Sequence, residues 1–194
     1  MGAGIVAGAR CGAGLSASQR VGRRFSVAGM SGAGKSTIAR TIASRLDLPY
    51  VELDALFHGP NWSEPSPDEF KRRVLALIDG HDGWVVDGNY HGKLDELVLE
   101  RADTFVWLDL PLRVALRRIW RRTWGRILSR EELWAGNRER IWTAFLMRDS
   151  LVHWAVKAHF RHRREFPGLL ERHPHLELVR LRSPRDVERW LSSI

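Results

Sequence analysis

The feature that most constrains this chain is a glycine-rich octet, Gly29-Met30-Ser31-Gly32-Ala33-Gly34-Lys35-Ser36, which fits G-x-x-x-x-G-K-S without a gap. A short apolar run, Phe25 to Ala28, precedes the octet, and from Lys35 to Leu46 apolar residues recur at helical spacing. In a strand, loop and helix of this order, loop N–H groups and the positive end of the helix dipole surround a phosphate. The sequence therefore predicts a phosphate-binding loop, or P-loop.

The octet also predicts the ligand. We expect Lys35 to reach the β- and γ-phosphates of ATP, the Ser36 hydroxyl to ligate Mg²⁺, and Thr37 to contact the α-phosphate. Backbone contacts are expected from Gly29, Ser31, Gly32, Ala33 and Gly34. A turn that binds nothing has no need of Lys and Ser at these two places, and a dinucleotide-binding loop would want a third glycine at position 37. The predicted cofactors are ATP and Mg²⁺.

Other apolar runs and helical patterns set the expected fold. After the first strand we expect strands at 50–53, 84–86, 104–108 and 176–181. Helices are expected at 35–46, 66–78, from 112 onward, from 129 to about 164 with a break near 136, and from 183 to about 191. Strands that alternate with helices form parallel sheets covered on both faces. We therefore predict a three-layer α/β P-loop NTPase fold with a five-stranded parallel sheet and a helical, basic lid.

The 194 residues fit a single domain. Residues 1–22 are rich in Gly, Ala and Ser and contain no acidic residue, so we expect a disordered leader followed by one kinase-like domain over 23–194, with the lid at about 118–165. Cys11 is the only cysteine, which excludes an internal disulfide and a four-cysteine zinc site. No apolar run is long enough to span a membrane, and we expect a soluble, cytoplasmic protein.

The formal charge of +8 is concentrated in one segment. Residues 112–165 contain 13 arginines and one lysine against five acidic residues, so the rest of the chain is close to neutral. This excess can serve as a clamp for polyphosphate or as a face for nucleic acid, or it can be a solvated helix surface. The tryptophans interleaved with these arginines either stack bases or pack the core and the lid.

Several segments resemble nucleoside monophosphate kinases. Val85-Val86-Asp87-Gly88 is similar to the Asp-Gly that ends the third strand in that family, where the aspartate holds a magnesium-bound water. Leu108-Asp109-Leu110-Pro111, followed by Arg118 and Arg122, is similar to the entry into the lid of adenylate kinase, whose lid arginines contact ATP. The resemblance implies a magnesium role for Asp87 and ATP contacts for Arg118 and Arg122, whereas Asp109 is expected to be structural.

A broader likeness runs from about Phe25 to the C-terminus. Stretches around Leu53-Asp54-Ala55-Leu56-Phe57, Pro60-Asn61-Trp62 and Gly136-Asn137-Arg138-Glu139 resemble the adenylate-kinase-related DNA topology modulation (FlaR-like) proteins. Adenylate kinases follow Asp-Gly with an aromatic residue, a proline and an arginine that grips the acceptor nucleotide. Here Asn89-Tyr90-His91 stands instead, so the resemblance does not imply AMP as the acceptor.

Asp54 follows the second predicted strand and is the candidate for acceptor chemistry. A carboxylate there either orients or deprotonates an acceptor hydroxyl, or caps the following turn. The favoured function is a small kinase that transfers the γ-phosphate of ATP to a small, nucleotide-like molecule. The alternative is a nucleotide-regulated protein that binds nucleic acid and affects DNA topology; a kinase for polynucleotide ends would combine both signatures.

Overall fold

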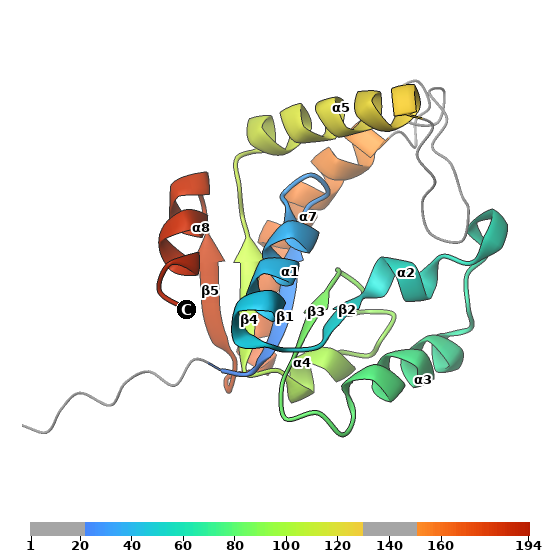
Figure 1. The fold of residues 1–194 in the computed structure, drawn as a ribbon, viewed down its shortest axis with the longest axis vertical. Helices are drawn as coiled ribbons and strands as arrows, with labels where there is room; N and C mark the ends of the chain where they lie inside the picture. The colour runs from blue at the N-terminus through green and yellow to red at the C-terminus, as the bar shows by residue number, and fades with distance from the viewer. Residues whose placement is uncertain (1–21, 130–150) are drawn as a thin grey trace, which may run out of the picture.

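Five parallel strands form the centre of the structure (Figure 1), a computed structural model that describes residues 22–129 and 151–194. The strands are β1 (Arg24–Gly29), β2 (Tyr50–Glu52), β3 (Trp84–Asp87), β4 (Thr104–Leu108) and β5 (Glu177–Leu181). They pair in the order β2-β3-β1-β4-β5. The central strand β1 therefore has β3 on one side and β4 on the other, and all three end at the same edge. In open α/β sheets this edge is where ligands bind.

Helices cover both faces of the sheet. One face packs against α1 (Lys35–Leu46), α5 (Leu112–Ser129) and α8 (Pro184–Leu191). The other packs against α2 (Leu53–Phe57), α3 (Pro67–Ile78), α4 (Leu97–Arg101) and α7 (Leu151–Arg172). Val27 and Ala28 are neighbours in β1, yet each belongs to a different core cluster, one on each face. Because both faces are covered, the three inner strands β1, β3 and β4 are buried on both sides. The predicted three-layer fold is confirmed.

The elements that the sequence did not predict are short. They are α2, α4 and a 3₁₀ turn over Pro60–Trp62, each of three to five residues. Hydrophobic periodicity needs a longer window than this to reveal a helix. A second helix was predicted to begin at Ser129, but α5 continues through this residue. The predicted break near Gly136 lies outside the described residues, as does most of the leader.

Helix α7 ends later than predicted. The pattern indicated an end near Arg164, but the helix continues through Pro167 to Arg172. Proline in a helix removes one hydrogen bond and crowds the preceding turn. Phe166 and Leu169, on either side of it, are buried in the core beneath the sheet, and this burial holds the last turns in place. Across the described ranges, no helix combines the length and apolar character that a membrane crossing requires.

Candidate functional site

The loop between β1 and α1 has the backbone that the glycine pattern predicted. Gly32 and Gly34 adopt positive φ angles of 76° and 94°. A Cβ on Gly32 would lie 2.6 Å from the carbonyl oxygen of Ala115 in α5, so no larger residue fits there. Gly34 occupies the N-cap of α1, and the positive end of that helix dipole faces the loop.

A cavity of about 1310 Å³ begins at this loop. Its lining includes Ser31, Gly32, Gly34, Lys35, Ser36 and Thr37, which all come from the predicted phosphate site. Gly29 and Ala33 were predicted with them but do not line the cavity. The backbone N–H and C=O of Gly29 are both bonded to a side chain, and the Ala33 carbonyl accepts a hydrogen bond from Arg118. These two residues hold the loop in place through their hydrogen bonds to Asn89 and Arg118.

Asp87 ends β3 beside the start of α1. Its side chain is buried, its Oδ2 accepts a hydrogen bond from the Tyr50 hydroxyl at 3.3 Å, and its Oδ1 has no hydrogen-bond partner within residues 22–129 and 151–194. Burial raises the pKa of Asp87, and the nearby Lys35 ammonium and Ser36 hydroxyl oppose the rise. A buried carboxylate oxygen without a partner, next to a serine hydroxyl, suits Mg²⁺, which is commonly held by one or two protein oxygens, waters and substrate phosphates.

Asp54 lies in the first turn of α2 and lines the same cavity. Its Oδ1 accepts a 2.7 Å hydrogen bond from the Tyr90 hydroxyl, which lies 3.4 Å from His58 Nε2. Burial and the Asp54 carboxylate raise the pKa of Tyr90, so this hydroxyl stays a donor. Asp54 does not serve as the N-cap of α2, since that position is Glu52, whose side chain makes no capping hydrogen bond. The capping alternative for Asp54 is therefore wrong.

The two predicted lid arginines both belong to α5. Arg118 lines the cavity, and its Nη1 donates to the carbonyl oxygen of Ala33 at 2.8 Å. The backbone of Arg122 is helical, but its side chain lies outside the described part of the structure, so a joint contact of the two arginines stays a prediction. Asp109 is buried and accepts hydrogen bonds from Arg163 and Arg180. These bonds support the structural role expected for Asp109.

Comparisons with known proteins identify the family of this chain. No protein-family model matches the chain. Shikimate kinase of Novosphingobium aromaticivorans is 32% identical over 143 residues, which cover 64% of this chain and 71% of that protein. The chain belongs to the family of small P-loop kinases that includes shikimate kinase.

Two other relatives of this P-loop kinase match over a shorter stretch. Shikimate kinase of Paramagnetospirillum magneticum is 34% identical over 115 residues, and cytidylate kinase of Halobacterium salinarum is 29% identical over 108. The chain spans only 58% and 55% of the lengths of these two proteins.

Two solved structures share the fold. Shikimate kinase from Bacteroides thetaiotaomicron superposes with a TM-score of 0.54 at 14% identity, covering 89% of this chain and 96% of that one. A gluconokinase from Sinorhizobium meliloti 1021 superposes with a TM-score of 0.50 at 19% identity, covering 88% and 91%. At these identities the likeness concerns the fold alone.

Asn89 is a site residue that the sequence analysis missed. Its Oδ1 accepts from the Gly29 N–H at 3.0 Å, and its Nδ2 donates to the Gly29 carbonyl at 2.7 Å. The two bonds join the loop after β3 to the last residue of β1, where the P-loop begins. The sequence offered Asn89 only as a departure from adenylate kinases, because nothing local pairs positions 60 residues apart.

We expect Asn89→Asp to loosen the P-loop. The change removes the donor to the Gly29 carbonyl and places a second oxygen against it, and a lost buried hydrogen bond costs about 2 kcal/mol. The thermal midpoint should fall by roughly 5 °C, and calorimetry should show weaker ATP binding. Asn61→Asp is the control, because Asn61 does not line the cavity. Wild-type ATP affinity and midpoint in Asn89→Asp would refute a positioning role.

Two imidazoles, those of His91 and His162, also line the cavity. His162 of α7 stacks on Phe166 at 4.6 Å between ring centroids, and its Nδ1 has no hydrogen-bond partner in the described part of the chain. Burial lowers the pKa of His162 to about 3 and that of His91 to about 4. Both rings are therefore neutral near pH 7 and add no charge to the cavity.

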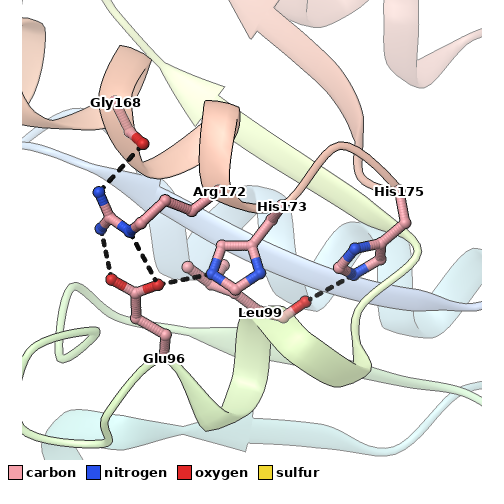
Figure 2. Close-up of polar contacts among 6 residues, drawn as sticks. All are labelled: Glu96, Leu99, Gly168, Arg172, His173 and His175. Atoms are coloured by element: carbon pink, nitrogen blue, oxygen red, sulfur yellow. Dashed lines mark hydrogen bonds and ion pairs between the residues drawn. The ribbon is translucent and has the colours of Figure 1, made fainter.

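A polar cluster ties the loop after β3 to the end of α7 (Figure 2). The Glu96 carboxylate lies 2.6 Å from His173 Nε2 and accepts a hydrogen bond from Arg172. Arg172 also donates to the Gly168 carbonyl at 3.0 Å, and His175 Nε2 lies 3.1 Å from the Leu99 carbonyl. Hydrogen bonds from Arg172 and His173 lower the pKa of Glu96, so the carboxylate stays charged. Glu96 and Arg172 line the cavity, so the cluster holds this part of the lining in place between the loop after β3 and the end of α7.

Proposed function

We propose that this P-loop kinase is an ATP-dependent phosphotransferase that transfers the γ-phosphoryl group to a hydroxyl of a small molecule. The observation that supports this proposal most is a shared cavity. It is lined by Lys35 and Ser36 at the start of α1 and also by Asp54 with its hydrogen-bond partner Tyr90. A phosphate donor and an acceptor can therefore meet in one cavity, as transfer requires.

The residues divide the chemistry between them. Lys35 offsets the negative charge on the β- and γ-phosphates, and Arg118, with Arg122 by resemblance, adds positive charge along the ATP. Ser36 and Asp87 would hold Mg²⁺, which supplies charge neutralisation on the phosphate oxygens when bound. Asp54, oriented by Tyr90, accepts the proton of the attacking hydroxyl.

A coupled ADP-release assay over nucleosides, nucleoside monophosphates, sugars and hydroxy acids tests this proposal. We expect ADP release that depends on an acceptor and on Mg²⁺, with an equal amount of phosphorylated acceptor in the ³¹P spectrum. ADP release at the same rate with and without every acceptor would identify an ATPase and overturn the proposal.

The second candidate is a nucleic-acid-binding function of the FlaR-like kind that affects DNA topology. Its support is the surface of α5, where Arg117, Trp120, Arg121 and Trp124 are all exposed. The exposure of Trp120 and Trp124 contradicts the core-packing alternative for these two residues. Counterion release would make DNA affinity fall steeply with salt. A DNA affinity that does not change with salt, or no DNA binding at low salt, would remove this candidate.

On the evidence of the sequence, we also propose a cytoplasmic location and a single domain over 23–194.

A further inference from the structure

The acceptor side of the cavity is formed by α2, the turn after it, the loop after β3 and α7. Its charged lining residues, among those described, are the carboxylates Asp54, Glu64, Glu96 and Glu165 and the cations Lys93, Arg161 and Arg172. Each cation lies against a carboxylate: Lys93 with Glu64 at 2.9 Å, Arg172 with Glu96, and Arg161 with Glu165 at 3.7 Å. Among the described residues, this side therefore carries one more negative charge than its cations neutralise.

Asp54 is the carboxylate left over. Within residues 22–129 and 151–194, none of the ion pairs includes it, and its side-chain contact at 2.7 Å is to the neutral Tyr90 hydroxyl. An anionic acceptor would lie beside this charge, and would have to take Lys93 or Arg172 away from its carboxylate. Like charges brought together in a site act against binding. The lining therefore favours an acceptor without negative charge.

The same side presents a group of aromatic rings. Phe57 and Tyr90 lie 4.8 Å apart between centroids, and His58 and Trp62 lie 5.3 Å apart. Trp62 lines the cavity and is 43% exposed. The exposed indole face of Trp62, on the same side of the cavity as Asp54, provides a surface on which a planar ring can stack.

The backbone under Trp62 is unusual. Asn61 and Trp62 have φ angles of 53° and 60°, in the left-handed region that a bulky residue rarely adopts. Such conformations persist where the surrounding structure maintains them, and they gather at ligand sites. Here the turn over Pro60–Trp62 closes with a Gly59 N–H to Ser63 carbonyl bond of 2.8 Å. The turn holds the indole at the cavity instead of letting it pack in the core.

We infer that the acceptor is an uncharged molecule that joins a planar ring to a hydroxyl group, as a nucleoside does. The inference rests on the proposed phosphotransferase function. The ring stacks on Trp62 while the hydroxyl points at Asp54. In the transfer the hydroxyl oxygen forms a bond to the γ-phosphorus, the bond from that phosphorus to the β–γ bridging oxygen breaks, ADP leaves, and the hydroxyl proton passes to Asp54.

The test compares kcat/KM for adenosine, cytidine and thymidine with values for their 5′-monophosphates, shikimate and gluconate. We expect the kcat/KM of at least one nucleoside to exceed that of every anion by about a hundredfold or more. One unmatched charge in a site weakens binding by about this factor. Faster turnover of an anion overturns the inference and leaves the kinase function standing. If nothing is phosphorylated although ATP binds, the proposed function fails.

In that case calorimetry with a non-hydrolysable ATP analogue tests the acceptor inference separately. The inference is supported if a nucleoside binds and the anions do not, and any other result overturns the inference.

Two variants separate ring stacking from charge. Trp62→Leu should raise the KM for the nucleoside about tenfold or more, the usual effect of a lost stacking face, with a smaller change in kcat, and Trp62→Phe should restore most of the affinity. Glu165→Arg should improve turnover of the anionic acceptors relative to the nucleoside. Phe160→Leu is the control, because Phe160 is an exposed aromatic residue of α7 that does not line the cavity. An unchanged nucleoside KM in Trp62→Leu would overturn the stacking role.

Discussion

Lys35→Ala should reduce acceptor-dependent ADP release by at least about a hundredfold, the usual cost of removing one group that stabilises charge in a transition state. Lys35 starts α1 and lines the cavity next to Ser36, so its ammonium can follow the charge that moves toward the β–γ bridging oxygen. Its effect should appear chiefly in kcat, with a smaller loss of ATP affinity measured by calorimetry.

Lys71→Ala is the matched control. Lys71 belongs to α3, pairs with Asp95 and does not line the cavity, so its removal should leave turnover unchanged. Both variants should keep the far-UV spectrum and thermal midpoint of a folded protein. Wild-type turnover in folded Lys35→Ala would show that the glycine-rich loop does not bind the phosphates of the reacting ATP.

The parts of the site that the sequence predicts are those encoded by neighbouring residues. The P-loop octet encodes its turn and its helix start within eight positions, so spacing alone predicted that Lys35, Ser36 and Thr37 share one site, and all three line the cavity. Asp87 was predicted from the resemblance of Val85-Val86-Asp87-Gly88 to the Asp-Gly that ends the third strand in nucleoside monophosphate kinases. The carboxyl ends of parallel strands share one edge of a sheet whatever the strand order, and this brings these groups to the same edge.

The parts that the sequence does not predict depend on which strands are neighbours. Asn89 bonds to Gly29, and Tyr90 bonds to Asp54, because β3 pairs with β1 on one side and with β2 on the other. The alternation of strands and helices allows several strand orders, and hydrophobic periodicity does not choose among them. The contact between Glu96 and His173 likewise spans 77 residues. No pattern in the sequence near either residue predicts contacts of this kind.

Trp62 shows a different limit. Its left-handed backbone follows Asn61, which tolerates that region, but nothing in Pro60-Asn61-Trp62 indicates that the tryptophan itself adopts it. An exposed tryptophan in such a segment has no helical or strand periodicity to place it. Only the folded turn reveals that the indole lies at the cavity.

Asp54→Asn tests the proton acceptor with little change in shape. The amide keeps an oxygen that can accept the Tyr90 hydrogen bond, so the turn of α2 should stay in place, but it cannot take the proton of an acceptor hydroxyl. Because general-base catalysis contributes about 10² to 10⁴ in rate, we expect kcat to fall by that factor while the ATP affinity stays near wild type.

The control for Asp54→Asn is Asp95→Asn. Asp95 is exposed, pairs with Lys71 outside the cavity and has a φ of 47°, a region that asparagine tolerates well, so the same chemical change should leave kcat intact. The dependence of kcat on pH separates a proton acceptor from a residue that only positions the hydroxyl. Loss of a base removes the acidic limb of the wild-type profile, whereas loss of positioning lowers kcat equally at every pH. A drop of less than about tenfold, with the acidic limb retained, would mean that another group accepts the proton and that Asp54 serves to orient the acceptor.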